Sequence, residues 1–593
     1  MLYRYLVLLP LMALLSMNSS IAADNLICGF ETAEKAGWKK NSSGYCYASQ
    51  GWDKWEYTGE KYWNTDEEQH PSHYFWHVAQ GTMIMPYDLF MALLDPTNPT
   101  EKKKFSDIEN LKKFGFIPSI ETKRNPDGLP IGFVKDKEFK NPYTGVEMKM
   151  LGFNCAACHT GEVHYKGEKF LIEGGQAMVD MGDFKNGIKK ALEYTLKTTK
   201  NTELKKALIK YIKQAESTTI YSPAAFPEEG IGRIDALTRI GNLVFGEDLR
   251  ATENVRPVTA PVSYPPLWTV PWFNWAQYNG SIRQPMVRNI GEALGINALV
   301  KLTIEKEKET LFDSSVNIPN LVKIEELLQG TEKLKGLTAP QYPGGIDVQK
   351  AQQGRALYTE LCQSCHLPPV NSKEILTDKY WEKPNEYGKQ YLITHNIPLE
   401  TIGTDPTVAL EFYKRTADAS KLADALPLLT ELKVKIPADA DLNALGANDG
   451  LKVVTEAIAK KWYKKENKSQ DEQDKMNGYR KNIVLKPLAY RARPLNGVWA
   501  TPPYLHNGSI LNIYELLSPY EERTKVFYSG TKEFDSVNVG YKNLPIGTKI
   551  DTTQPGNFNT GHEFNNIVRQ GVIGRKLSEE ERYTLVEYIK TLH

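Results

Sequence analysis

The 593-residue sequence has few cysteines, no excess of either charge and no long apolar run beyond its N-terminus. Lysine and arginine number 73 against 72 aspartates and glutamates, so the chain offers no field that would hold a polyanion, and nucleic acid is excluded as a partner. A run of about 18 apolar residues, which a membrane-spanning helix needs, is also missing. We therefore expect no stable membrane anchor.

The N-terminus has the features of a cleaved secretory signal. It carries a positive charge at Arg4, an apolar run from Leu6 to Met17, and the small residues SIAA before a cleavage site. The run is too short to span a bilayer. We expect residues 1–23 to be removed and the mature protein to be periplasmic or secreted, in a Gram-negative organism.

Two of the six cysteines, Cys28 and Cys46, lie near the start of the expected mature chain. Export to an oxidising compartment favours a disulfide between them. The alternative, a pair of buried free thiols, fits a cytoplasmic protein better. We predict the disulfide.

The other four cysteines stand in two Cys-x-x-Cys-His units. A zinc site would leave the histidine after each pair unexplained, and a redox dithiol needs no histidine there. Attachment of c-type haem uses every residue, because thiols one helical turn apart can reach both vinyl groups on one porphyrin edge and the histidine can bind the iron. Two covalently bound haems c are predicted. Their residues are Cys155, Cys158 and His159 for the first, and Cys362, Cys365 and His366 for the second.

Helical periodicity frames the second unit. Apolar residues recur at helical spacing in residues 348–361 before the unit, and again in residues 577–592 at the C-terminus, where Ser578 can cap a helix. Two such helices are the frame of a class I cytochrome c domain. We place this domain at residues 341–593, enlarged by a long insertion.

The first unit lies in a larger N-terminal haem domain, residues 24–340, which ends in a Pro- and Gly-rich stretch. Helical patterns occur in residues 75–94 and 183–199, separated by Pro- and Gly-rich sequence that indicates long ordered loops. The predicted fold class is mainly α with long irregular loops and little β. It consists of two cytochrome c-like haem domains with large insertions.

The group on the far side of each iron decides the chemistry, since a second protein ligand makes an electron-transfer centre and an open side can bind oxygen species. For the second haem, the class I frame supplies that ligand shortly before the C-terminal helix. Met476 lies in a charged insertion, and His395 is better explained as structural. His562 lies in a Gly-, Asn- and Thr-rich loop 16 residues before Ser578. We predict His562 as the ligand, with an exposed loop histidine as the alternative.

For the first haem no ligand stands out. His77, Met83 and Met85 lie on an expected helix, where core packing is the default for methionine. His164 is too close to His159 in sequence to cross to the opposite face. His70 and His73 lie in a polar loop. This lack of a ligand favours an open iron and is the main indication of catalysis.

Two further stretches could serve the haems. Residues 491–509 hold Arg491 and Arg493, which can bind haem propionates by paired hydrogen bonds. A rigid loop with ordinary salt bridges is the alternative. Residues 261–289 hold three tryptophans, which could relay electrons between haems or line an apolar channel; core packing is the alternative for each.

Several stretches together resemble the di-haem rubber-oxygenase-like (RoxA-like) cytochromes. That group is similar to the di-haem cytochrome c peroxidases, the MauG enzymes and periplasmic di-haem fatty-acid dioxygenases. The resemblance covers the chain from about residue 65 to its end, and the block at residues 491–509 is more specific to the group than the haem units are. The stretches are NPDGLPIGFVKD, NCAACHTGEVHYKG, APVSYPPLW, NGSIRQPMVRN, AQQGRALYTELCQSCH, RARPLNGVWATPPYLHNGS and GHEF.

The resemblance implies that the haem on His159 is the active one, with a distal side free for oxygen. It implies that the haem on His366 has His562 as its second ligand and exchanges electrons. An aromatic pair near the active haem of the rubber oxygenase suggests Trp268 as a catalytic residue here, with Leu267 in place of the neighbouring Phe. Because of that departure, polyisoprene cleavage is not carried over.

We therefore expect a periplasmic di-haem oxidoreductase that activates O2 at the N-terminal haem to oxygenate an unsaturated lipid or isoprenoid, with a small periplasmic electron donor as a further partner. Two alternatives stay open: a di-haem peroxidase that uses peroxide, and an electron carrier with both irons fully ligated. A peroxidase needs an acid/base group over the open iron, and the sequence indicates none. The peroxidase group also carries Ca2+, for which GANDG at residues 446–450 is a candidate loop.

Overall fold

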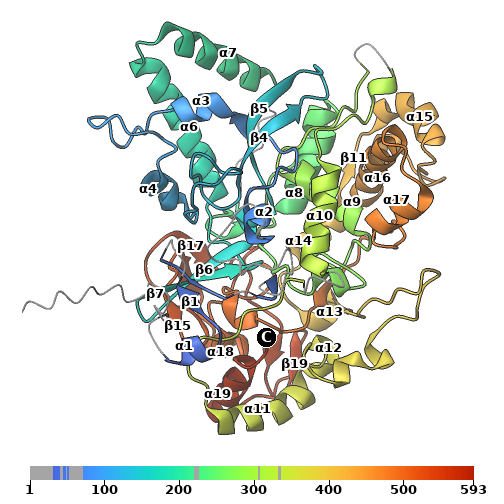
Figure 1. Ribbon diagram of the computed structural model, residues 1–593. Coiled ribbons are helices and arrows are strands. Elements are labelled where there is room, and N and C mark those ends of the chain that lie inside the picture. The colour runs from blue at the N-terminus through green and yellow to red at the C-terminus, as the bar shows by residue number, and fades with distance from the viewer. Residues whose placement is uncertain are drawn as a thin grey trace, which may run out of the picture.

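The computed structural model describes residues 28, 31–40, 44–48, 50–52, 71–218, 226–304, 308–330 and 336–593 (Figure 1). The expected signal at residues 1–23 and the loop histidine His70 lie outside these ranges. Within them, no helix is both long enough and apolar enough to cross a membrane.

Figure 1 shows the helices arranged around several small sheets. The helices before residue 340 are α1 (Glu31–Lys35), α2 (Pro71–His77), α3 (Tyr87–Ala92), α4 (Ile108–Leu111), α5 (Cys155–Cys158), α6 (Met181–Thr198), α7 (Thr202–Thr218), α8 (Ala236–Gly241), α9 (Pro285–Gly295) and α10 (Ile318–Gln329). Those after it are α11 (Val348–Leu361), α12 (Gln363–His366), α13 (Leu399–Ile402), α14 (Thr407–Lys414), α15 (Leu426–Glu431), α16 (Ala447–Lys465), α17 (Gln470–Met476), α18 (Ile513–Leu516) and α19 (Glu579–Ile589).

The strands are mostly short. They are β1 (Lys39–Lys40), β2 (Cys46–Tyr47), β3 (Met85–Pro86), β4 (Phe133–Lys140), β5 (Glu147–Phe153), β6 (Thr160–Tyr165), β7 (Glu168–Glu173), β8 (Arg233–Ile234), β9 (Val262–Ser263), β10 (His395–Pro398), β11 (Thr416–Ala417), β12 (Leu445–Gly446), β13 (Ala489–Ala492), β14 (Val526–Ser529), β15 (Phe534–Asp535), β16 (Gly540–Tyr541), β17 (Thr548–Asp551), β18 (Glu563–Phe564) and β19 (Val572–Gly574). The largest sheets have the orders β1-β2-β7-β6 and β3-β5-β4.

The prediction of a mainly α fold with little β is wrong. Helices hold 39% of the residues and strands 16%, distributed over many small sheets. The longest strands, β4 and β5, form an antiparallel pair. Burial along them does not alternate residue by residue, so their sequences lack the period of two that reveals a half-buried strand.

Three of the expected helices are confirmed as α6, α11 and α19, and the fourth prediction, at residues 75–94, is wrong. That stretch contains the end of α2, then β3, then α3. Gly81 interrupts it with a φ of 79°, at a point where a Cβ would collide with the backbone of Ser315. Pro86 then precedes α3 and cannot lie inside a longer helix.

Helices α11 and α19 pack closely and form the expected frame of the second haem unit. Gly354 of α11 leaves no room for a Cβ beside the carbonyl of Thr584. Ser578 caps α19 in a capping box, because its hydroxyl accepts from the Glu581 N–H and the Glu581 carboxylate accepts from the Ser578 N–H. The prediction of Ser578 as the cap is confirmed.

The largest hydrophobic core contains residues from both halves of the chain, from Cys28 to Leu592. Trp268 and Trp499 are fully buried in it. Cys28 and Cys46 form a disulfide, as predicted, with their Cα atoms 5.5 Å apart. The domain boundary at residue 340 remains a prediction.

Candidate haem centres

His366 and His562 face each other at the second predicted centre. Their ring centroids lie 6.0 Å apart, with 60° between the ring planes. A metal–imidazole bond of about 2 Å puts the centroids of two imidazoles on opposite sides of one metal about 6 Å apart. Burial lowers the pKa of His562 to about 3, so the ring is neutral near pH 7, as an iron ligand must be. The rings therefore have the spacing and protonation of a bis-histidine haem.

The Nδ1–H of His366 donates to the backbone carbonyl of Arg493 at 2.8 Å. This bond fixes the orientation of the ring and leaves Nε2 to bind iron, as is usual for histidine ligands. Cys362 and Cys365 flank the ring on the same turn, and neither is in a disulfide. The donor set fits a covalently attached haem.

Arg491 and Arg493 lie on β13 and directly after it. Burial lowers their pKa values to about 10 and about 9, so both remain charged near pH 7. In the described part of the chain no carboxylate is within ion-pair distance of either, and Nη1 of Arg491 has no hydrogen-bond partner. Buried cations without counter-charges are costly, and haem propionates would supply those charges. The arrangement fits their predicted role.

The first centre repeats the same anchoring. The Nδ1–H of His159 donates to the backbone carbonyl of Pro265 at 2.7 Å, which again leaves Nε2 for iron. Burial lowers the pKa of His159 to about 4. Cys155 and Cys158 lie on α5, whose first turn is capped by the side chain of Asn154. These residues also fit a covalently attached haem.

No histidine faces His159 as His562 faces His366, among the ring contacts of the described residues. Both ring nitrogens of His77 are in hydrogen bonds, to Phe133 O and to Ser119 Oγ, each at 2.9 Å. His164 is paired with two glutamates, Glu162 and Glu533. The other candidates lie elsewhere: Met85 in a phenylalanine-rich core, and His73 against the ring of Trp76.

The structure also brings an acid/base group to the first centre, which the sequence did not indicate. Burial, with a contribution from the nearby Glu292 carboxylate, raises the pKa of the Cys155 and Cys158 thiols to about 12. Glu292 accepts a 3.0 Å hydrogen bond from Gln277; its side chain is 43% exposed, and the loss of solvation on its covered side raises its pKa. Its i,i+4 pairing with Arg288 on α9 was the available sequence signal.

Trp268 joins the two anchoring segments. It lies three residues after Pro265, and its indole N–H donates to the carbonyl of Asn496 at 2.7 Å. Asn496 lies three residues after Arg493, whose guanidinium is 5.7 Å from the Trp268 ring centre. The indole therefore bridges the segment that holds His159 and the segment that holds His366.

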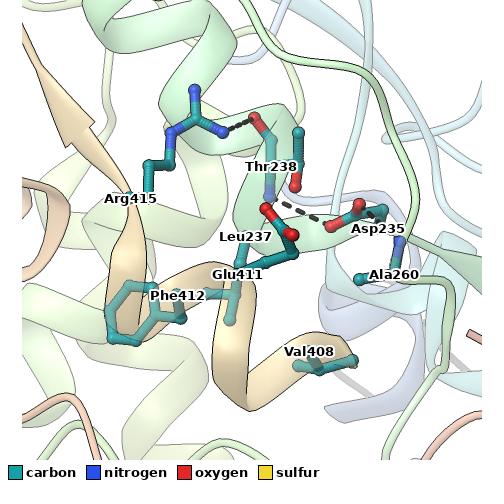
Figure 2. A pocket seen from close by; sticks show the side chains of 8 residues that line it. All are labelled: Asp235, Leu237, Thr238, Ala260, Val408, Glu411, Phe412 and Arg415. Carbon is teal, nitrogen blue, oxygen red and sulfur yellow. Dashed lines mark hydrogen bonds between the residues drawn. The ribbon is translucent and has the colours of Figure 1, made fainter. Parts of the chain in front are cut away.

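Two other features lie outside these centres. A cavity of about 10 Å³ between α8 and α14 (Figure 2) has room for little more than one water molecule, and none of the predicted haem residues lines it. Residues 447–450 of the calcium candidate form the first turn of α16 rather than a loop. In the described ranges, no group of three or more His, Cys, Asp or Glu side chains is placed to hold a metal ion.

Comparisons with known proteins agree with a cytochrome. Residues 489–528 match the family described as RoxA-like, cytochrome c-like, and the matched stretch includes Arg491 and Arg493. A cytochrome c-like domain binds haem c covalently, so the chain is a haem protein. Uncharacterized protein y4iJ of Sinorhizobium fredii is 38% identical over 570 residues, which are 87% of this chain and 90% of that protein. Uncharacterized protein y4iM of the same organism is 24% identical over 358 residues, which are 57% of this chain and 66% of that protein.

Proposed function

The chain belongs to the family of Sinorhizobium fredii protein y4iJ, and with its RoxA-like, cytochrome c-like segment as a second premise we propose that it is a periplasmic di-haem oxidoreductase. One observation carries the proposal. His159 and His366 are oriented in the same way, each by a backbone carbonyl, yet among the described residues only His366 has a second histidine across from it. The second haem would transfer electrons, and the first would be open to an oxidant.

A haem with one protein ligand supplies oxygen or peroxide activation, and a haem with two supplies electron transfer. The protein's own residues hold and connect these groups. The carbonyls of Pro265 and Arg493 orient the two iron-binding histidines, and the two arginines of residues 491–493 neutralise propionates. Trp268 provides a hydrogen-bonded connection between the segment that holds His159 and the segment that holds His366.

The proposed reaction is oxygenation of an unsaturated lipid or isoprenoid with O2. The RoxA-like, cytochrome c-like match supports a haem oxidoreductase, and the substrate class is part of our proposal. Leu267 and Trp268 would form part of an apolar wall beside the segment that holds His159. A small periplasmic electron donor would exchange electrons with the haem on His366.

A peroxidase is the second candidate, and Glu292 is the observation that favours it. A peroxidase needs a group that moves a proton between the oxygens of the peroxide. Glu292 is near the first haem unit, has a raised pKa and is oriented by Gln277. Replacing Glu292 by Gln would strongly lower peroxide turnover and would have a smaller effect on a reaction that uses O2.

Carbon monoxide titration of the reduced protein tests the proposal, because CO binds only to an iron with an open or easily opened side. We expect one CO per protein, and two in a His562→Ala variant. Binding of no CO by the unsubstituted protein would show two fully ligated irons and favour an electron carrier. Oxygen uptake with unsaturated fatty acids, compared with peroxide consumption, then separates the two enzymes.

A further inference from the structure

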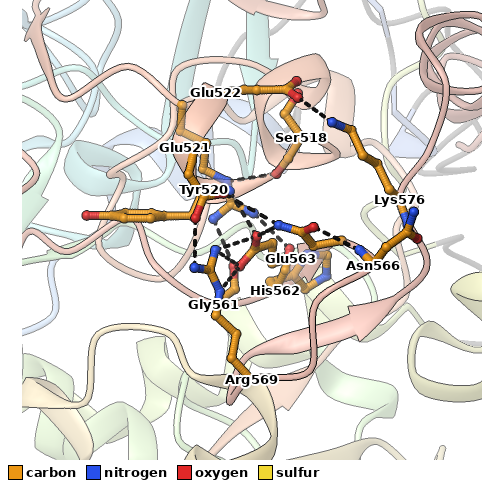
Figure 3. Close-up of polar contacts among 12 residues, drawn as sticks. Ser518, Tyr520, Glu521, Glu522, Gly561, His562, Glu563, Asn566, Arg569 and Lys576 are labelled. Atoms are coloured by element: carbon orange, nitrogen blue, oxygen red, sulfur yellow. Dashed lines mark hydrogen bonds and ion pairs between the residues drawn. The ribbon is translucent and has the colours of Figure 1, made fainter.

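Arg523 has an unusual set of hydrogen bonds directly behind His562. Its side chain is buried, and all five hydrogen bonds that its guanidinium donates go to backbone carbonyls. No carboxylate of the described chain is within ion-pair distance of it, although Arg569 nearby has two (Figure 3). The acceptors are Leu516 O at 3.3 Å, Ser518 O at 3.2 Å, Asn559 O at 2.5 Å, Gly561 O at 2.8 Å and His562 O at 3.0 Å.

Three of these acceptors belong to the loop that carries His562, so the guanidinium fixes that loop from one side. From the other side, the N–H of His562 donates to the carbonyl of Ile402 at 2.8 Å. Gly561, with a φ of 68°, packs against the backbone of Gly403 with no room for a Cβ. The peptide before the ligand is thus held between a guanidinium and a neighbouring chain segment.

His562 itself has a φ of 43°, in the left-handed region that non-glycine residues rarely adopt. Such a conformation is strained and persists only where the surroundings enforce it. The loop would therefore leave this conformation if the guanidinium were removed. The ring would then move away from the position 6.0 Å from His366.

We propose that Arg523 is the positioning residue that holds His562 as the sixth ligand of the second haem, and that its unpaired positive charge raises the reduction potential of that haem. This inference rests on the proposed function, in which His562 binds the second iron. The sign follows from electrostatics, because a nearby cation disfavours the ferric state, which carries one more positive charge than the ferrous state.

The chain offers a matched control in Arg569. It is also an arginine near His562, but its guanidinium pairs with Glu563 and Glu521 and donates to none of the loop carbonyls (Figure 3). Arg569→Gln removes one guanidinium from the same region and leaves the Arg523 bonds in place. This control tests whether the loss of any cation near His562 opens the second haem or changes its reduction potential.

The experiment compares Arg523→Gln, Arg523→Lys, Arg569→Gln and His562→Ala as full-length holoproteins. For each, CO bound per protein, the low-spin EPR signal and the potential of the second haem are measured. We expect Arg523→Gln to bind CO at the second haem and to show a weaker low-spin signal there. We expect Arg569→Gln to resemble the unsubstituted protein.

Arg523→Lys keeps the charge but lacks the planar fork that reaches several carbonyls at once. We expect Arg523→Lys to open the second haem in part of the molecules, and the molecules that remain low-spin to keep the reduction potential of the second haem. In the low-spin molecules of Arg523→Gln, we expect that reduction potential to be lower. If Arg523→Gln does not fold, Arg523→Lys tests the inference alone. Unchanged CO binding and an unchanged low-spin signal in Arg523→Lys would overturn the inference.

Different outcomes refute the assignment of His562 and the role of Arg523. If His562→Ala still binds only one CO, the assignment of His562 is wrong and the inference falls with it. If His562→Ala binds two and Arg523→Gln binds one with an unchanged spectrum and potential, the ligand assignment stands and the role of Arg523 is refuted.

Discussion

Replacing Trp268 by phenylalanine should slow electron transfer between the two haems while both remain bound. The fully buried indole makes the hydrogen bond to Asn496 that connects the segment holding His159 to the segment holding His366. Phenylalanine keeps an aromatic ring at this position but removes the N–H donor and about a third of the ring system. The hydrogen-bonded connection between the two segments is broken.

The expected loss of stability is modest. The carbonyl of Asn496 keeps a second donor, Nη2 of Arg493 at 3.2 Å, so the missing hydrogen bond costs about 1 kcal/mol. The smaller ring leaves a cavity that adds about 1 to 2 kcal/mol. The variant should therefore unfold with a free energy about 2 to 3 kcal/mol lower and still carry both haems.

Trp499→Phe is the matched control. Trp499 is fully buried in the same core, and its indole N–H donates to the carbonyl of Pro340 at 3.0 Å. Its loss leaves a buried carbonyl unpaired, so the cost to stability is at least as large as for Trp268→Phe. It does not join the two anchoring segments.

The assay reduces the protein by one electron with a light-activated donor and follows the absorption of each haem over time. We expect Trp268→Phe to redistribute the electron about tenfold more slowly, which corresponds to about 1.4 kcal/mol of barrier, and Trp499→Phe to match the unsubstituted protein. Equal slowing in both variants, or none in Trp268→Phe, would refute the assigned role.

Three further variants test other parts of the structure. Arg491→Gln with Arg493→Gln removes two buried cations and should lower at least one haem potential in spectroelectrochemistry; two unchanged potentials would count against propionate binding. Cys28→Ser with Cys46→Ser opens a loop of 18 residues and should cost about 3 kcal/mol in urea unfolding, and an unchanged midpoint would contradict this. Burial raises the pKa of Glu173 from 4.5 to about 7, so its contribution to stability is complete below pH 4.5 and is lost as the pH rises through 7. Glu173→Gln should therefore unfold less readily than the unsubstituted protein at pH 8, by about 3 kcal/mol, and the difference should vanish near pH 4, as urea titrations at both pH values would show.

The sequence predicted the parts of the molecule that have a side-chain signature. The two Cys-x-x-Cys-His units and the amphipathic helices α6, α11 and α19 have fixed spacings, and the cap at Ser578 has a characteristic residue. His562 was inferred from its distance to α19. The facing rings of His366 and His562 agree with that inference without testing the iron bond itself.

The parts that could not be predicted depend on contacts between distant segments. The acceptors that orient His159 and His366 are backbone carbonyls, which every residue has, so the sequences around Pro265 and Arg493 carry no signal for them. The five carbonyls around Arg523 likewise leave no signal in the sequence. Strands β4 and β5 were missed because tertiary burial on both faces removed their alternation.

The same anchoring carbonyls have a consequence for how the protein is made. His159 is synthesised 106 residues before its acceptor at Pro265, and His366 is synthesised 127 residues before its acceptor at Arg493. Each haem-attachment unit is therefore available while its histidine is still free to rotate. Neither ligand can be locked by its carbonyl until the chain has reached Pro265 or Arg493. A protein truncated before residue 493 would carry attached haems with unanchored histidines at one of the two sites.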